Sequence, residues 1–459
     1  MAALSTTTLS QADIAAIADR HPAVFAGSRR KQLTRWLIGL SIVAYLCFAW
    51  WFFAIGTVLA NGNWGIAGIY LADWVSYETR PNIDFTDGGL HVQYPRYSAY
   101  NENRQPAWVE LQDIRSPGVA GRVSMTIGDG TVEILPGRVT ARRGTETVVI
   151  AVSPDRTVTA EGPLPSWAIP EPAGDAIMLR FGFSGSVEIE GDEVKVRQRF
   201  WGWENFVFDP NSPFWGKPFG EVMSLIFSGE RIKPEMSNAA LAWDNILNNA
   251  EWQHGDVWLK LGQTIVMAFV GTVFASLLAF PLAFAAARNI TRSRVVNQVL
   301  KRFFDFQRSV DMLIWALFFT RAFGPGPLAG ISAIFFTDTG TFGKLYSEAL
   351  ENIDDRQREG IRSVGAAPVL VQRYGVLPQV LPLFISQSLY FWESNTRSAT
   401  IIGAVGAGGI GLKLWEAMRT NSDWENVAYM VLLILVVVFV FDNISNALRK
   451  RLVNSQAAH

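Results

Sequence analysis

Long apolar runs alternate with charged segments along this 459-residue chain. Residues 36–60, 261–287, 374–392 and 426–441 contain no Asp, Glu, Lys or Arg. A helix of about 20 apolar residues crosses the hydrocarbon core of a bilayer. Because helices and closed barrels are the structures that satisfy their backbone polar groups in lipid, each run predicts a membrane-spanning helix.

A further apolar region, residues 303–347, is interrupted by charged side chains that include Asp311, Arg321 and Asp338. The sequence Phe-Gly-Pro-Gly-Pro at 323–327 is typical of a helix break. We therefore expect two more helices, roughly 303–322 and 326–347. One long helix followed by a surface segment is the alternative. The predicted fold is a mainly α-helical polytopic membrane protein with about six transmembrane helices.

The region between the first two runs has a different character. Alternating stretches such as 107–111 and 187–190 predict half-buried strands, and turn signals recur at 87–89, 128–130, 143–144 and 190–192. Short strands with such turns predict a β-sandwich or a barrel at roughly 82–208, and residues 219–256 are expected to be a helical lead-in to the next span. A platform for an external partner and a ligand-binding sensor domain are both open as its role.

Basic residues mark the cytoplasmic side of a membrane protein. Residues 1–35 carry five basic and two acidic side chains, residues 288–302 carry five basic and no acidic ones, and residues 61–256 carry 16 basic and 26 acidic ones. Six crossings with both termini inside place 348–373 with the basic segments in the cytoplasm and 61–256 outside. The first run is too long, and its basic flank starts too late, for a cleaved signal peptide, so we expect a retained anchor.

These patterns divide the chain into five parts. They are a cytoplasmic tail at 1–35, a first transmembrane helix at 36–60, an extracytoplasmic insert at 61–256, a five-helix core at 257–450 with a cytoplasmic loop at 348–377, and a cytoplasmic tail at 451–459. The composition agrees, since 18% of the residues are charged against about 25% in soluble proteins.

Cysteine and histidine usage bears on metal binding. Cys47 is the single cysteine, so neither an internal disulfide nor a cysteine-based metal site can form. The histidines are scattered along the chain at His21, His91, His254 and His459. We therefore expect no metal site.

A spaced motif follows the predicted helix 326–347. It consists of Glu359-Gly360-Ile361, Gly365-Ala366 and Gly375-Val376-Leu377-Pro378. It resembles the coupling loop of ATP-binding-cassette importer permeases, which reads Glu-Ala-Ala, three residues, Gly, nine residues, and Ile-x-Leu-Pro. Gly360, Ile361 and Gly375 depart from that pattern, but the spacing is kept. The resemblance implies that a short helix and turn dock on an ATPase, with the residues Glu359, Gly360, Ile361, Gly365, Ala366, Leu377 and Pro378.

Three other stretches resemble the phosphonate-type permeases of that family. They are residues 267–289, the Gly-Pro-rich turn at 323–330, and the run Glu-Ser-Asn-Thr-Arg-Ser-Ala-Thr at 393–400. The resemblance covers roughly 230–450 and the first span. Two features depart from the family: the β-rich insert, and an Arg-Ser-Val-Asp sequence at 308–311 in place of Arg-Ser-Ile-Pro. Both departures leave the exact substrate open.

Polar side chains directly follow the apolar run 374–392, and charges at membrane depth are costly and often functional. The helical repeat places Glu393, Ser394, Arg397 and Ser398 on one face. In one interpretation Arg397 lines a translocation path and meets an anionic headgroup. In the other, given equal weight, Glu393 and Arg397 fasten helices together. The candidate path residues are Tyr390, Glu393, Ser394, Asn395, Arg397 and Ser398.

The spacing of two further sets of residues, one charged and one of glycines, suggests where each set lies in the helical core. Asp305, Arg308 and Asp311 repeat every three residues and are interpreted as the solvated start of the third span, with a position facing the helix bundle or the cytoplasmic mouth as the alternative. The segment 406–411 matches the dinucleotide fingerprint G-x-G-x-x-G in form, but the strand that this fingerprint requires before it is not predicted. We interpret the glycines of 403–411 as positions of close helix packing and a mobile outer gate: Gly403, Gly406, Gly408, Gly409 and Gly411.

The resemblance implies a permease subunit of an ATP-binding-cassette importer in a bacterial inner membrane. It implies a homodimer, a pair of cytoplasmic ATPases that bind ATP and Mg, and an external substrate-binding protein, while the chain itself binds no cofactor, metal or nucleic acid and carries no catalytic residues. The implied substrate is a small phosphorus oxyanion: a phosphonate, with phosphite and phosphate as alternatives. The rival function is a membrane-anchored sensor, which has no need of the coupling-loop spacing.

Overall fold

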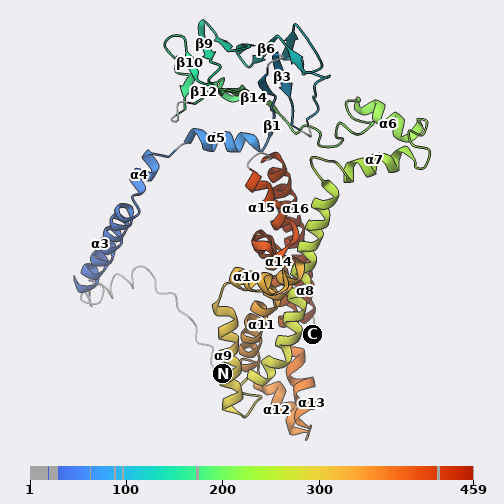
Figure 1. Ribbon diagram of the computed structural model, residues 1–459. Helices are drawn as coiled ribbons and strands as arrows, with labels where there is room; N and C mark the ends of the chain where they lie inside the picture. The colour runs from blue at the N-terminus through green and yellow to red at the C-terminus, as the bar shows by residue number, and fades with distance from the viewer. Residues whose placement is uncertain are drawn as a thin grey trace. The chain divides into compact units, whose positions relative to one another are not determined.

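The computed structural model describes residue 19 and residues 29–62, 64–86, 89–95, 98–171, 175–420 and 424–457 (Figure 1). The chain divides into two compact units, Met1–Gly68 and Ile69–His459. Most of the predicted tail at 1–35 lies outside the described residues.

The first unit contains the first predicted span as two helices. α3 covers Arg29–Phe52 and α4 covers Ile55–Ala60, and α5 (Trp64–Asp73) follows at the boundary between the units. The prediction of one continuous helix at 36–60 is wrong at Ala54, where a backbone φ of 48° separates the two helices. Large apolar side chains of α3 are exposed, as is Trp36 at 79%. Such an all-apolar exposed surface is expected of a helix that contacts lipid.

The second unit begins with a β-rich region of two antiparallel sheets. The first has the order β11-β12-β13-β14-β2-β3-β5, with β1 paired to β14, and the second has the order β10-β9-β8-β7-β6-β4. The strands of the first sheet are β1 (Ser76–Thr79), β2 (Asn82–Thr86), β3 (Gly89–Gln93), β5 (Val119–Ala120), β11 (Ala168–Pro170), β12 (Ile177–Arg180), β13 (Gly185–Ile189) and β14 (Glu193–Trp201). The strands of the second are β4 (Val109–Gln112), β6 (Arg122–Ile127), β7 (Gly130–Leu135), β8 (Arg138–Arg143), β9 (Glu146–Val152) and β10 (Val158–Ala160).

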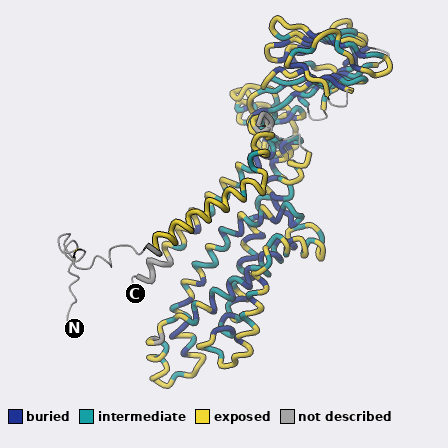
Figure 2. The backbone as a smooth tube through the Cα atoms, turned by 90° about the vertical axis from the view of Figure 1, so that its left-hand side faces the viewer, coloured by how far each residue is buried: buried dark blue, intermediate teal, exposed yellow. Residues whose placement is uncertain are grey.

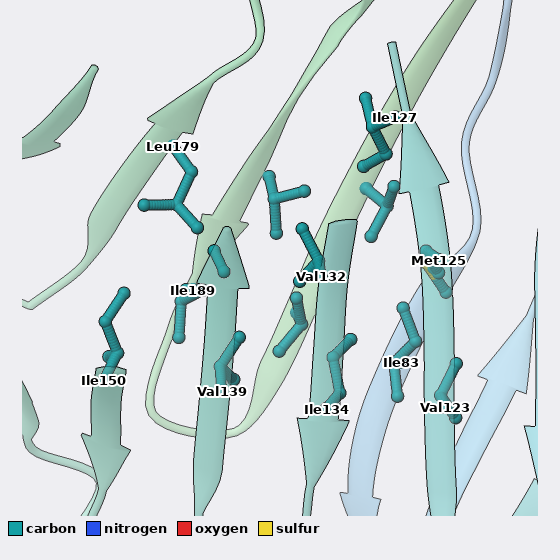
Figure 3. Packing of buried hydrophobic residues seen from close by; sticks show 14 of the residues in the cluster. Ile83, Val123, Met125, Ile127, Val132, Ile134, Val139, Ile150, Leu179 and Ile189 are labelled. Carbon is teal, nitrogen blue, oxygen red and sulfur yellow. The ribbon is translucent and has the colours of Figure 1, made fainter. Parts of the chain in front are cut away.

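The inward-facing side chains of the two sheets form one apolar core (Figure 3). Ile83, Val123, Ile134 and Leu179 are completely buried, and along β6 buried and more exposed positions alternate as a half-buried strand requires. The structure is therefore a β-sandwich, with strands from Ser76 to Trp201 rather than 82–208. The turns predicted at 128–130, 143–144 and 190–192 join paired strands, whereas residues 87 and 88 of another predicted turn lie outside the described residues.

A helical domain follows the sandwich. The predicted lead-in at 219–256 is two short helices, α6 (Phe219–Ser228) and α7 (Asn238–Leu247). The remaining helices are α8 (His254–Ala286), α9 (Arg294–Ser309), α10 (Met312–Phe323), α11 (Pro327–Glu351), α12 (Asp355–Ser363), α13 (Pro368–Val371), α14 (Leu377–Ile402), α15 (Gly409–Thr420) and α16 (Trp424–Ala457). Two wider π-helical turns, Gln372–Val376 and Gly403–Ala407, flank α14.

The helices differ from the prediction in three places. The predicted helix 303–322 is two helices, because the Asp311 carboxylate accepts a hydrogen bond from the Leu313 amide (2.8 Å) and caps the start of α10.

Four helices among the described residues are long and apolar enough to cross a membrane: Lys31–Phe52, His254–Ala286, Pro368–Ala407 and Trp424–Arg451. α10 is apolar but shorter, and α16 continues beyond residue 450 to Ala457.

Small residues allow α8 to lie close to its neighbours. Ala275, Ala279 and Ala283 of α8 are completely buried, and Figure 2 shows buried positions following the inward faces of the long helices. Where helices face one another in lipid, small side chains permit the close backbone approach on which packing depends. Gly271 is the tightest of these positions in α8, because it faces Ile334 of α11.

Gly271 and Gly262 provide a matched test of this packing in one helix. A Cβ at Gly271 would lie 2.7 Å from Cβ of Ile334, whereas a Cβ at Gly262 would meet no described atom within 4 Å. We expect Gly271→Ala to destabilise the protein by about 1–3 kcal/mol and Gly262→Ala to be neutral or stabilising. Thermal unfolding of the detergent-purified chain measures both, and equal midpoints would contradict the close approach.

Candidate functional site

Three buried polar side chains from α8, α11 and α14 bond to one another. Nδ2 of Asn395 donates to Oδ2 of Asp338 at 2.5 Å and to Oγ1 of Thr272 at 2.8 Å. Asp338 and Asn395 are each 2% exposed, and Thr272 is 1% exposed. Burying a carboxylate costs free energy unless it is hydrogen-bonded, so the hydrogen bond from the Asn395 amide lowers the cost of burying Asp338. Sequence reasoning noted Asp338 as a charge in an apolar run but had no signal that pairs it with Asn395.

A second polar layer joins the same three helices. The Tyr346 hydroxyl of α11 lies 2.9 Å from Oγ of Ser276 in α8 and 2.9 Å from Oγ of Ser388 in α14. Ser276 follows Thr272 by one helical turn, so the two layers lie along one seam. Sequence reasoning missed this layer, since isolated serines and a tyrosine in apolar helices give no distinctive pattern. The two layers together set the register of α8, α11 and α14.

Glu393 of α14 links two arginines. Its Oε1 accepts from Nη2 of Arg397 at 3.2 Å, and its Oε2 accepts from Nη2 of Arg449 of α16 at 3.3 Å. The guanidinium of Arg449 also lies over the Tyr390 ring, 5.6 Å from its centroid. Sequence reasoning gave Arg449 no role in packing or transport, since it lies near the end of the predicted core at 257–450. The structure instead makes it the partner that ties α16 to the buried Glu393 side chain.

The six predicted path residues separate into two groups. Glu393 and Asn395 are buried and bond to side chains of other helices, Glu393 to Arg449 and Asn395 to Asp338 and Thr272. The Glu393–Arg397 pair joins two positions of α14. Tyr390 is 46% exposed and the Arg397 side chain is 53% exposed, while Ser394 and Ser398 are half-buried. Arg397 is therefore both a partner of Glu393 and an accessible cation.

The glycine segment between α14 and α15 packs closely against two other parts of the helical domain. The Gly406 carbonyl accepts from the Gly326 amide at 3.0 Å, and the Ile410 amide donates to Oγ1 of Thr264 at 2.9 Å. The backbone is non-helical at Gly406, whose φ is 98°, so a side chain there would be strained. Side chains at four other positions would overlap neighbouring backbone or side-chain atoms: Gly403, Gly408, Gly409 and Gly411.

The predicted coupling residues form a helix, a turn and a second helix. Glu359 and Gly360 are exposed on α12, and Ile361 and Ala366 are half-buried. Gly365 has a φ of 80° and ends the turn after α12. Leu377 is half-buried and Pro378 exposed in the first turn of α14, where proline is tolerated. Sequence reasoning missed two outward apolar side chains beside the turn, Val364 (81% exposed) and Val369 (75% exposed).

The sandwich meets the helices at a polar cavity of about 250 Å³. It is lined in part by Glu78, Arg80, Glu204 and Glu251. Burial raises the pKa of Glu204. Burial also acts to raise the pKa of Glu78, but Arg80 and Arg199 outweigh it and lower that pKa overall. Ionised Glu78 is thus stabilised here, whereas the environment of Glu204 favours its protonated form.

Aromatic side chains hold this junction together. His254 at the start of α8 lies 2.8 Å from the Tyr429 hydroxyl of α16 and 2.6 Å from the Phe206 carbonyl of the linker. Nε1 of Trp252 donates to the Glu204 carbonyl at 2.8 Å, and Trp203 packs beside Trp252. The linker after β14 is therefore anchored on both α8 and α16.

One group of carboxylates in the described chain has the spacing of a metal site. Ligand atoms of Glu190, Asp192 and Glu193 lie within 4.8 Å of one another. Lys195 forms ion pairs with Glu190 and Glu193, and Arg156 pairs with Asp192 at 3.3 Å. These cations already compensate the charge that a metal ion would bring, so the group fits ion pairing better than metal binding.

Residues 279–454 match the family described as binding-protein-dependent transport system inner membrane component. The phosphite transport system permease protein PtxC of Stutzerimonas stutzeri is 38% identical over 194 residues, which cover 42% of this chain and 70% of that protein. A protein of Escherichia coli whose name describes a cryptic phosphonate transport system permease is 52% identical over 121 residues, or 26% of this chain and 98% of its own. A solved structure, the methionine ABC transporter MetNI in an inward-facing conformation, aligns with 43% of this chain and 95% of its own at 19% identity and a TM-score of 0.38.

The Asn395 amide should be needed for stability because it satisfies Asp338. Asn395→Leu leaves the buried carboxylate without this donor, and we expect a loss of about 1.5–3 kcal/mol. Asn443→Leu is the control, since Asn443 is exposed and donates to the Phe439 carbonyl of its own helix. The difference in thermal unfolding measures the effect, and two equally stable variants would show that Asp338 does not depend on Asn395.

Proposed function

Since the chain belongs to the family of binding-protein-dependent transport system inner membrane components, we propose that it is the permease subunit of an ATP-binding-cassette importer for a small phosphorus oxyanion. The observation that carries the proposal is the exposed helix–turn–helix at 355–371, with Gly365 in a left-handed conformation at its turn. Relatives named for phosphite and phosphonate transport support the substrate class. The family membership does not favour the membrane-anchored sensor.

In this proposal six crossings place both termini in the cytoplasm and the sandwich outside. Contacts between two basic segments support it: the Lys301 ammonium pairs with Glu351 at 2.7 Å, and the Arg358 guanidinium donates to the Asn289 carbonyl at 3.4 Å. Both pairs join the segment 288–302 to the segment 348–373, so these segments share one end of the helices. The acidic segment 61–256 is expected at the other end.

The exposed turn couples the permease to an ATPase. Val364 and Val369 offer an apolar contact, and the charged side chains of α12 surround it with polar groups, as is usual at a protein interface. α13, the π-helical turn and α14 form a continuous chain of helical backbone. A displacement of the turn by ATPase closure therefore moves α14 as a rigid body. ATP and Mg bind to the separate ATPase pair, and the chain itself holds no cofactor and performs no chemistry.

Arg397 provides the charge for an oxyanion on the path. Its guanidinium is half exposed, and its carboxylate partner Glu393 is shared with Arg449, so Arg397 retains capacity to bond an anion. Guanidinium groups match the geometry of phosphorus oxyanions. A homodimer would supply one Arg397 from each copy, and an external binding protein would deliver the substrate. In this arrangement the sandwich is a platform for that binding protein.

Reconstitution with the candidate ATPase and binding protein tests the function. We expect ATP hydrolysis in proteoliposomes to be stimulated by one member of a panel of phosphonates, phosphite and phosphate. Gly365→Asp and Glu359→Lys should abolish this stimulation while the protein remains inserted, because the first adds a charged side chain at the exposed turn and the second reverses an interface charge. Gly262→Ala is the control, because Gly262 lies in α8, outside the coupling segment, with no described atom within 4 Å of its Cβ position.

The outcomes of that experiment separate the parts of the proposal. Assembly with the ATPase without stimulation by any member would remove the substrate class but keep the importer. No assembly with the ATPase would remove the importer itself, and wild-type stimulation in Gly365→Asp would remove the coupling role.

Alanine substitutions of Arg397 and Arg449 separate a residue that contacts the substrate from one that stabilises helix packing. Arg397→Ala should lower uptake by roughly tenfold to hundredfold through loss of charge-assisted hydrogen bonds to the substrate, with little change in unfolding temperature. Arg449→Ala should lower the unfolding temperature, because it leaves a buried carboxylate with one partner fewer. Unchanged uptake in assembled Arg397→Ala would assign Arg397 to fastening alone.

A further inference from the structure

A basic cavity of about 600 Å³ opens between the end of α8, α9 and α11. Four cationic side chains and one carboxylate line it, together with apolar and amide groups: Arg288, Lys301, Arg302, Lys344, Asp305 and Val299. The cavity is distinct from the α14 residues of the proposed path and from the exposed turn at Gly365.

The cations of this cavity are only partly neutralised. Lys344 lies 3.4 Å from Asp305 and 3.8 Å from Glu348, and Arg302 lies 3.4 Å from Asp305. Lys301 pairs with Glu351 at 2.7 Å. The Arg302 side chain is 86% exposed, and the Arg288 guanidinium donates no hydrogen bond within the described part of the chain. The cavity therefore retains positive charge for an anionic group.

An apolar stripe on α9 continues from the cavity. The stripe consists of exposed side chains at helical spacing, Val295 (70%), Val299 (60%), Phe303 (41%) and Phe306 (54%). Val299 belongs to both the stripe and the cavity wall. The opposite face of α9 is buried, since Phe304 and Gln307 pack against glycines of α11. α9 therefore has one face packed against α11, an opposite exposed face that is apolar, and basic side chains along the edge between them.

We propose that this cavity and stripe bind an anionic phospholipid. The headgroup phosphate lies among Arg288, Arg302 and Lys344, and an acyl chain lies along the stripe. Basic pockets between membrane helices bind anionic headgroups in this way. A free oxyanion would contact the same cations but would leave the apolar stripe unoccupied. A helix that merely faces lipid would explain the stripe but not the basic cavity.

Lipid titration of the purified full chain, followed by native mass spectrometry, tests the proposal. Phosphatidylglycerol should bind and phosphatidylcholine should not, and excess inorganic phosphate should fail to displace the bound lipid. The double variant Arg288→Gln/Arg302→Gln should bind phosphatidylglycerol about thirtyfold more weakly. Arg302→Lys keeps the charge and should retain binding.

Arg308→Gln is the matched control, because Arg308 is an exposed arginine of the same helix that does not line the cavity. It should bind phosphatidylglycerol as the wild type does. Equal binding of the two lipids, unchanged binding in the double variant, or displacement by inorganic phosphate would each overturn the proposal. Arg302→Gln alone, at a highly exposed position, provides the same test if the double variant unfolds.

Discussion

The close approach of α8, α11 and α14 is the constraint on which the rest of the helical domain depends. Lipid gives little hydrophobic driving force between helices, so small residues and buried polar bonds hold them together. Because Gly271 has no side chain, Ile334 packs directly against the backbone of α8. This close contact brings Asp338 within hydrogen-bonding distance of Asn395, which also bonds to Thr272. Without that approach the Asp338 carboxylate would be buried without partners, at a cost of several kcal/mol.

α14 connects the features that the proposed mechanism uses. Its first turn follows directly on a π-helical turn that leads back to the exposed segment 355–371. Further along it carries Asn395, which bonds inward, and Arg397, which stays half exposed. Glu393 pairs with both Arg397 and Arg449. The pair with Arg449 connects α14 to α16, and the Arg397 guanidinium remains partly exposed. Structure and transport thus draw on neighbouring positions of one helix.

The sandwich is an addition with a core of its own. It is joined to the helices through the aromatic linker around Trp203 and Trp252 and through His254, which bonds to Tyr429. A packed aromatic junction transmits displacement better than a flexible linker, since its side chains cannot rearrange without losing contact. Movement of α8 or α16 at this end therefore reaches the sandwich, as a platform for a binding protein would require.

The sequence by itself determined the apolar spans, the alternating strands of the insert and the spacing around Gly365, because each is a short-range pattern. The tertiary structure decided what depends on residues far apart. The division of the predicted helix 303–322 is different, because Asp311 caps α10 through the Leu313 amide two residues away, which is a local signal that sequence reasoning missed. The tertiary structure brought distant partners together. It paired Glu393 with Arg449, 56 positions later, and Asp338 with Asn395, 57 positions later. Such partners meet only when helices pack, and helical periodicity reports which face a residue occupies but not which helix lies opposite.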